Sequence, residues 1–301
     1  MPLLVKLSKT APRFKSFIKS CKEKHGDFFS INSSQNTWVF PSSSPTAAFS
    51  LFERKWESSI LHESRWGLKW ACARSKKELE KAILHLPRVF QKLNASSVAV
   101  RIPMSDHYFV QVLEKTGFSY SGGLVVLAQE HPALSIGTRP PVNSLRRIQK
   151  KDIPQLEKIA FNSFQEGRFY HERGLKKGAA QKIYSAWGKN AVNYADEVWV
   201  AEQNKILGFV SLKKDIQIKR LWIDLIAVTP KAQGRGLGKW LVQKSVQSAS
   251  QTAGWSLGVK TEPENLKALR FYLKNGFLLE SFQLDYFWRP AETKRIRSPK
   301  G

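Results

Sequence analysis

The 301-residue chain is poor in cysteine and in long apolar runs. Its two cysteines, Cys21 and Cys72, cannot build a disulfide framework, although a single bridge stays open. Its apolar runs fall far short of the roughly 20 residues that a membrane-spanning helix needs. The basic N-terminus lacks a continuous apolar segment and a small-residue cleavage site, and it has no acid before Glu23. We therefore expect a reduced cytoplasmic protein without a membrane span, with a weak mitochondrial-type presequence as the alternative.

Acidic residues are also scarce, because 24 Asp and Glu oppose 49 Lys and Arg for a formal charge of +25. Such a charge attracts anions, whether nucleic acid, an anionic membrane or a phosphorylated small molecule. The basic residues are spread along the chain, however, and no helix-turn-helix, zinc finger or RNA-binding signature accompanies them. Six scattered His and two distant Cys give no metal-ligand spacing, so no metal site is expected. Nucleic-acid binding stays open as an alternative.

The length predicts two domains, and a hydrophobic content of 42% is adequate for their cores. A turn-rich stretch of Ser, Asn and Pro occupies residues 30–44 and is expected to be a loop. A second stretch rich in Pro and Gly is expected to be a linker. The predicted order is an N-terminal extension (1–48), a first lobe (49–130), the linker (131–144), a second lobe (145–289) and a basic tail (290–301).

A glycine-rich loop organises the second lobe. The apolar run Leu221–Val228 predicts a buried strand, and Pro230 ends it. Glycines follow at 234, 236 and 238, and then a helix whose apolar stripe repeats every four residues from Leu237. Free N–H groups at such a helix start, together with glycines that allow close approach, form an anion site. The spacing is neither the dinucleotide fingerprint nor a Walker A loop.

Two motifs identify the second lobe as similar to the GNAT acetyltransferases. The loop has the pattern Q-x-x-G-x-G at Gln233, Gly236 and Gly238. Residues 265–277 follow the pattern N-x-x-A-x-x-x-Y-x-K-x-G-F almost letter for letter. The resemblance implies an α/β (α+β) fold with a mixed, centrally splayed sheet flanked by helices, and acetyl-CoA as acyl donor.

The resemblance also implies roles for individual residues. The pantetheine arm would pair with the backbone of Ile226, Ala227 and Val228, and Asn265 would cap a helix and touch the same arm. Tyr272 would be the general acid, with a core aromatic facing the sheet as the alternative. Main-chain N–H groups would hold the pyrophosphate, and they come from Gln233, Gly234, Arg235, Gly236, Leu237 and Gly238. The side chains of Arg235 and Lys239 would add positive charge.

The general base is less defined. Asp224 lies four residues before Val228, so a regular strand places both side chains on one face, whereas a bulge would break that parity. A buried carboxyl group can have its pKa raised towards the working range of a base. A water chain to solvent is the competing hypothesis, and Asp285 and Tyr286 are lesser candidates.

The first lobe resembles a degenerate repeat of the second. An offset of 159 lays Val98–Arg101 on Leu257–Lys260 (98 to 257) and Asp106 on Asn265. The same offset lays the segment K-T-G-F at 115–118 on K-N-G-F at 274–277. No glycine lies where the phosphate loop would fall, so the first lobe is expected to be a smaller, degenerate GNAT-like lobe without that loop.

A narrower resemblance concerns the acceptor. Residues 163–171 (SFQEGRFYH), the pair Tyr184 and Trp187, and residues 285–289 (DYFWR) are similar to acyltransferases that acetylate a TDP-linked 4-amino-4,6-dideoxy sugar. By this resemblance the acceptor site is lined by Arg168, Phe169, His171 and Tyr286.

The implied activity is direct transfer, in a ternary complex, of acetyl from acetyl-CoA to a primary amine of a nucleotide-linked amino sugar. An acetyltransferase acting on a protein or another small amine is one alternative, and a non-catalytic nucleic-acid-binding protein on a GNAT scaffold is the other. A homodimer stays open.

Overall fold

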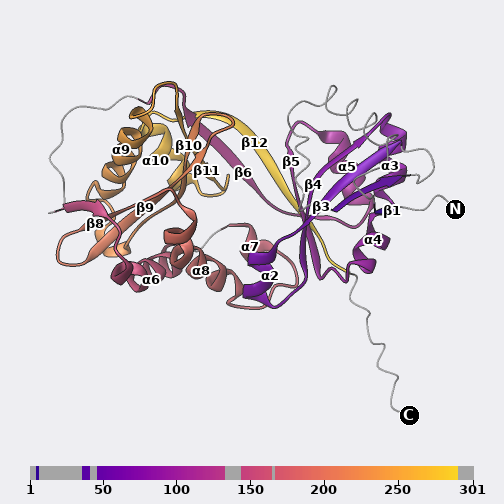
Figure 1. Ribbon diagram of the computed structural model, residues 1–301, viewed down its shortest axis with the longest axis horizontal. Helices are drawn as coiled ribbons and strands as arrows, with labels where there is room; N and C mark the ends of the chain where they lie inside the picture. Colours follow the sequence, from indigo (N-terminus) through magenta and orange to yellow (C-terminus); the bar gives the residue numbers. More distant parts are fainter. Residues whose placement is uncertain (1–4, 7–35, 41–45, 133–143, 165–166, 291–301) are drawn as a thin grey trace, which may run out of the picture. The chain divides into compact units, whose positions relative to one another are not determined.

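The computed structural model describes residues 5–6, 36–40, 46–132, 144–164 and 167–290 (Figure 1). The chain divides into two compact units. Unit 1 comprises Met1–Tyr120 with Asp285–Gly301, and unit 2 comprises Ser121–Leu284. Most of the predicted extension and linker, Cys21 and the predicted basic tail lie outside the described residues.

Unit 1 contains strands in the order β1-β2-β3-β4-β5-β12. The strands are β1 (Val5–Lys6), β2 (Asn36–Phe40), β3 (Ala47–Glu53), β4 (Arg65–Ala73), β5 (Ser97–Pro103) and the end of β12 (Leu278–Trp288). The helices are α2 (Lys55–Leu61), α3 (Lys76–Ile83), α4 (Leu86–Lys92) and α5 (His107–Lys115).

The structure differs from two expectations for unit 1. The loop expected over residues 30–44 is wrong at Asn36–Phe40, which form β2 and pair antiparallel with β3. Thr, Trp, Val and Phe favour strands, and the edge of β3 supplies the partner that sequence proximity could not reveal. The helical spacing from Lys76 to Leu93 yields two helices, because Pro87 begins a new helix where its missing N–H is not needed.

Unit 2 contains strands in the order β12-β6-β11-β10-β9-β8-β7. Besides β12, the strands are β6 (Ser119–Gln129), β7 (Ser144–Arg147), β8 (Glu197–Glu202), β9 (Ile206–Asp215), β10 (Arg220–Val228) and β11 (Ser256–Thr261). The helices are α6 (Ile153–Ser163), α7 (Arg168–His171), α8 (Ala179–Tyr194), α9 (Leu237–Ser250) and α10 (Leu266–Lys274), with short 3₁₀ turns at Lys150–Asp152 and Pro230–Ala232.

The expected hairpin at 203–205 joins β8 to β9. The helices expected at 107–115 in unit 1 and at 177–190 in unit 2 are present, with small changes in where they begin and end. Asp152 precedes α6 as expected, but its carboxylate pairs with Arg146 instead of capping the helix.

Helices cover both faces of the unit 2 sheet (Figure 1). On one face, α9 and α10 pack Leu237, Leu241 and Tyr272 against Leu221 and Ile223 of β10. On the other face, α6 and α8 pack against Phe209, Leu225 and Ala227. The sheet is mixed, since β10 pairs parallel with β11 and antiparallel with β9.

The internal repeat is confirmed by element boundaries. With the offset of 159, β5, α5 and β6 fall on β11, α10 and β12 almost residue for residue, and Asp106 and Asn265 each accept a hydrogen bond from the N–H three residues on. The last strand of each repeat contributes to the unit formed by the other repeat. Most of β6, which ends the first repeat, belongs to unit 2 and pairs with β11, while the end of β12, which ends the second repeat, belongs to unit 1. The compact units therefore differ from the predicted ranges 49–130 and 145–289, which follow the repeats along the chain.

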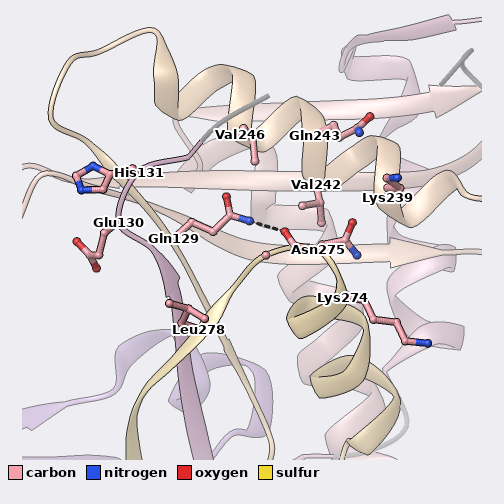
Figure 2. A pocket seen from close by; sticks show the side chains of 11 residues that line it. Gln129, Glu130, His131, Lys239, Val242, Gln243, Val246, Lys274, Asn275 and Leu278 are labelled. Atoms are coloured by element: carbon pink, nitrogen blue, oxygen red, sulfur yellow. Dashed lines mark hydrogen bonds between the residues drawn. The ribbon is translucent and has the colours of Figure 1, made fainter. Parts of the chain in front are cut away.

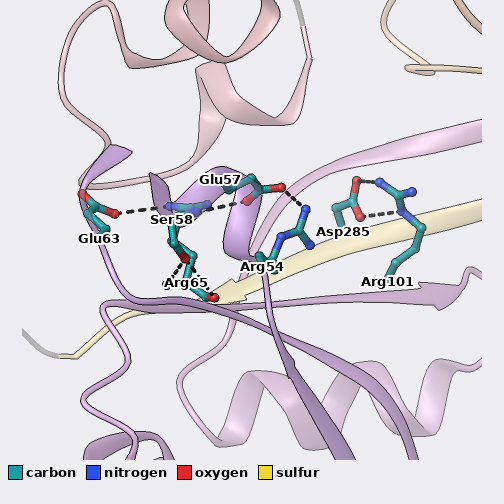
Figure 3. Close-up of polar contacts among 7 residues, drawn as sticks. All are labelled: Arg54, Glu57, Ser58, Glu63, Arg65, Arg101 and Asp285. Carbon is teal, nitrogen blue, oxygen red and sulfur yellow. Dashed lines mark hydrogen bonds and ion pairs between the residues drawn. The ribbon is translucent and has the colours of Figure 1, made fainter. Parts of the chain in front are cut away.

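Ion pairs with at least one buried partner connect elements of unit 1 (Figure 3). Arg65, which is 1% exposed, donates to Glu57 at 3.1 Å and to Glu63 at 3.3 Å. Arg101 donates to both carboxylate oxygens of the buried Asp285, at 2.8 and 2.9 Å. Asp285, a lesser candidate for the base, is thus engaged in a bidentate ion pair.

Candidate active site

The central strands of unit 2 part from one another at their carboxyl ends. β10 and β11 are paired in parallel only from Arg220 with Ser256 to Ile223 with Val259. β10 continues to Val228 along β9, so its backbone at Ile226, Ala227 and Val228 has no register partner in β11. The expected splayed sheet is present, and its opening lies where the pantetheine arm was expected.

The glycine loop follows directly at the end of β10. Gly234 and Gly236 have φ values of +78° and +80°, and no atom lies within 4 Å of where a side chain would begin at either residue. Glycine is therefore required by backbone conformation and leaves open space beside the loop. Gly236 is the N-cap of α9, and the first helical hydrogen bond runs from the Trp240 N–H to the Gly236 carbonyl at 3.2 Å. The N–H groups of residues 237–239 precede this bond and have no backbone partner among the residues that the structure describes, so they suit an anion.

Side chains support the loop from two directions. The Gln233 amide donates to the Val228 carbonyl at 3.1 Å and accepts from the Lys267 ammonium at 2.7 Å. Arg235 and Lys239 are exposed, and Gly238 lies against the ring of Phe271.

Lys239 also borders a hollow of about 540 Å³ on the α9–α10 face, where Gln129 donates to the Asn275 carbonyl at 2.6 Å (Figure 2). Neither Asp224 nor Tyr272 lines this hollow.

Helix α10 carries the second motif. The Asn265 side chain accepts from the Ala268 N–H at 3.0 Å, which confirms the predicted cap, whereas its contact with a ligand stays a prediction. Tyr272 is buried, with its ring edge-on to Phe271 and Phe277. Burial and the nearby charge of Glu262 raise the pKa of Tyr272 well above its ordinary value. The hydroxyl is therefore protonated at neutral pH, as a general acid must be.

A β-bulge places Asp224. The register of β10 with β9 shifts between Ile223 and Leu225, and the Ser211 hydroxyl accepts the displaced Leu225 N–H at 3.1 Å. After the bulge Leu225 packs on the α6–α8 face, whereas Val228 packs on the α9 face. The regular-strand expectation that Asp224 and Val228 share a face is therefore wrong, for the reason that a bulge inverts the alternation.

Asp224 is oriented by helix α8. Its Oδ2 accepts a hydrogen bond of 2.9 Å from the indole N–H of Trp187. Burial raises the pKa of the Asp224 carboxyl, while the Trp187 hydrogen bond and the charges of Lys213 and Lys260 act in the opposite direction. A carboxylate with a raised pKa is a stronger base than a solvated one.

An aromatic cluster surrounds this helix. The Tyr184 ring is stacked with Phe164 at 5.3 Å, with Tyr170 at 6.0 Å and with Trp187 at 6.2 Å between ring centroids. A side chain built at Gly167 would begin 2.2 Å from the Tyr184 hydroxyl and 2.7 Å from Glu262 Oε1. Tyr184 and Glu262 thus converge on Gly167.

The predicted acceptor residues belong to both units, with Arg168, Phe169 and His171 in unit 2 and Tyr286 in unit 1. Arg168 lies over the ring of the buried Phe169, 4.3 Å from its centroid, and Phe169 packs edge-on to Tyr184. His171 is exposed on α7. Tyr286 belongs to unit 1, where its hydroxyl donates to Glu114 at 2.8 Å and burial raises its pKa to about 12.

Sequence reasoning missed two participants in this arrangement. Glu262 follows β11 and raises the pKa of Tyr272, but a carboxylate after a strand has no distinctive pattern. In the sequence, Trp187 stands out only as half of a Tyr-x-x-Trp pair. The three-residue spacing places both rings on one helix face, which was the available signal.

The arrangement offers groups that suit acyl transfer: N–H groups at a helix start, a gap between strands, a protonated tyrosine on the α9–α10 face and a carboxylate on the α6–α8 face. No helix in the described part of the chain is long and apolar enough to cross a membrane.

Comparison with known proteins supports this interpretation. A family model described as an acetyltransferase (GNAT) domain matches residues 195–278. The spore coat polysaccharide biosynthesis protein SpsD of Bacillus subtilis (strain 168) is 26% identical over 244 residues, which are 79% of this chain and 83% of SpsD. The dTDP-fucosamine acetyltransferase of Escherichia coli O6:H1 is 29% identical over 195 residues, 62% of this chain and 79% of that protein.

Among solved structures, a tandem GNAT protein from the clavulanic acid biosynthesis pathway matches with a TM-score of 0.61. The match covers 95% of this chain and 98% of that chain at 10% identity, so it concerns the fold alone. The tandem architecture agrees with the internal repeat described above.

Proposed function

We propose that this chain, whose residues 195–278 match the GNAT acetyltransferase domain and which is an N-acetyltransferase, transfers acetyl from acetyl-CoA to a primary amine of a nucleotide-linked amino sugar. The observation that carries the proposal is the parting of β10 and β11 beside the start of α9, with Asp224 on one face of the sheet and Tyr272 on the other.

The chain fits the acyl donor at three places. The N–H groups at the start of α9 suit a pyrophosphate, since the helix dipole favours negative charge and the left-handed glycines leave the approach open. The unpaired backbone from Ile226 to Val228 suits the amide groups of a pantetheine arm. Arg235 and Lys239 add positive charge beside the loop.

Acetyl-CoA supplies a thioester, whose carbon–sulfur bond breaks as the amine nitrogen bonds to the acetyl carbon. The Asp224 carboxylate takes a proton from the amine, which approaches from the α6–α8 face. The Tyr272 hydroxyl gives a proton to the departing sulfur from the opposite face. Because the strands part between the two residues, the acid and the base act on opposite sides of one reacting carbon.

Three observations support an amino-sugar nucleotide as acceptor. Two relatives are named for polysaccharide biosynthesis and for dTDP-fucosamine acetylation. The aromatic cluster of Phe164, Tyr170, Tyr184 and Trp187 offers ring faces on which a base or a sugar can stack. Arg168 is a planar donor suited to phosphate, and the net positive charge favours an anionic acceptor.

The test is an acceptor panel with acetyl-CoA: a dTDP-linked amino sugar, the free amino sugar, a lysine peptide and a polyamine. We expect the nucleotide sugar to be acetylated with the highest kcat/KM. Arg168→Ala should raise KM for it with little change in kcat, while the exposed neighbour Arg173→Ala should leave both unchanged. Acetylation of the peptide or polyamine, with no activity on the nucleotide sugar, would refute the acceptor and retain the transferase.

A further inference from the structure

The hydrogen bond from Trp187 to Asp224 joins helix α8 to the bulge of β10. The indole Nε1 lies 2.9 Å from Oδ2 of the carboxylate. An indole N–H can only donate a hydrogen bond, so Trp187 is the donor and Oδ2 of Asp224 is the acceptor in this contact. Among the described residues no second hydrogen bond reaches Asp224, which leaves Oδ1 available for another partner.

Trp187 is itself held by packing. It is half-buried and stacked almost parallel to Tyr184, with 10° between the ring planes, and Tyr184 is in turn stacked with Phe164 and Tyr170. A ring supported in this way has few alternative rotamers, so the N–H direction is set before any ligand binds.

The other groups facing Asp224 come from the neighbouring strands. Lys213 on β9 and Lys260 on β11 both favour the charged carboxylate. Lys260 also lies 4.4 Å from the centroid of the Trp222 ring. These two ammonium groups act through charge, whereas Trp187 is the described group that contacts the carboxylate through a directed hydrogen bond.

We propose that Trp187 is a positioning residue for the acetyl-transfer base: its indole N–H holds Oδ2 of Asp224 and thereby directs Oδ1 towards the acceptor amine. The inference rests on the proposed function, because it assigns Asp224 the role of base. It further implies that the aromatic cluster aligns the base as well as lining the acceptor side.

The first experiment compares Trp187→Phe with Trp199→Phe. Trp199 makes the same kind of bond, to Glu197 Oε2 at 2.9 Å, outside the acceptor side of the sheet. Trp187→Phe should lower kcat at least about tenfold, the lower end of the typical worth of a hydrogen bond to a charged group. It should also move the acid limb of the kcat profile to higher pH, because a bond that lowers the Asp224 pKa is lost. Trp199→Phe should change neither.

A double-mutant cycle separates this proposal from the base assignment. In an Asp224→Asn background, the further change Trp187→Phe should have little effect on the residual rate. Wild-type kcat and pH profile in Trp187→Phe, with Asp224→Asn impaired, would overturn the role of Trp187 and retain the base. An equally large loss from Trp187→Phe in both backgrounds would also overturn it, since the effect would then be on packing. A fully active Asp224→Asn enzyme would refute the assignment of Asp224 as the base and, with it, the positioning role of Trp187.

A spectroscopic test needs no activity and no folded variant of Trp187. In protein labelled with ¹⁵N-tryptophan, the Trp187 indole N–H signal should titrate with Asp224 and lose this titration in Asp224→Asn. The Trp199 signal serves as the internal control. A Trp187 signal that does not respond to pH, or that responds identically in Asp224→Asn, would overturn the proposal.

Discussion

Lys69 and Asp224 occupy equivalent positions in the two repeats and carry opposite charges. The register skips one residue at a β-bulge in each repeat, Lys69 where β4 pairs with β3 and Asp224 where β10 pairs with β9. Each follows the last parallel pair before the strands part, Leu68 with Val100 in unit 1 and Ile223 with Val259 in unit 2. Unit 1 thus retains the parted strands, while a cation stands at the position of the proposed base.

Unit 1 also lacks the phosphate loop. Between strand and helix it has the two residues 74–75, where unit 2 has the eight residues 229–236. We therefore expect one acetyl-CoA to bind per chain, because within the described ranges the left-handed glycines at a helix start belong to unit 2. Isothermal titration calorimetry measures this number directly, and a stoichiometry of two would contradict the assignment.

Replacing Gly236 by Val should abolish acetyl-CoA binding or weaken it at least tenfold, about 1.4 kcal/mol. A β-branched residue is strained at a φ of +80°, and relief of that strain would move the N–H groups of the loop. Gly254→Val is the matched control, since Gly254 has a φ of +75° and equally open surroundings after α9. Both variants should lose stability, but only the first should lose the thermal shift with acetyl-CoA. Unchanged affinity in Gly236→Val would show that the loop does not bind the donor.

Tyr272→Phe should lower kcat by about 10- to 100-fold, or ~1.4–2.7 kcal/mol, with acetyl-CoA affinity nearly unchanged. The ring, which packs against Phe271 and Phe277, is retained, so the melting temperature should change little. Tyr108→Phe, which removes a hydroxyl bonded to the Lys76 carbonyl in unit 1, controls for hydroxyl loss in general. A fully active Tyr272→Phe enzyme would assign this residue to core packing alone.

Asp224→Asn should lower activity and yet raise the melting temperature at neutral pH. Burial raises the Asp224 pKa in the folded protein above its unfolded value, so ionisation of the folded protein costs stability as pH rises. Below the unfolded pKa the carboxyl is protonated in both states, and this difference between the two proteins should vanish. Thermal melts from about pH 3 to pH 8 provide the measurement. A difference that grows on acidification would contradict the direction of the pKa shift.

The sequence alone determined the local elements of the site. Glycines at 234 and 236 supply a backbone conformation that other residues resist, and Asn265 caps its helix through a contact three residues away. Such features depend on near neighbours in the chain, as does the four-residue stripe of α9. The repeat at an offset of 159 was also readable, because its helices and caps kept their spacing.

Tertiary structure decided the relationships between distant residues. The bulge at Asp224 depends on pairing with β9 and on the buried hydroxyl of Ser211, and it inverted the face expected from alternation. The exchange of β6 and β12 between units depends on which strand edge is available, which no local pattern encodes. Trp187 meets Asp224 only because α8 packs across the sheet face that the bulge exposes, so their hydrogen bond is a product of the fold.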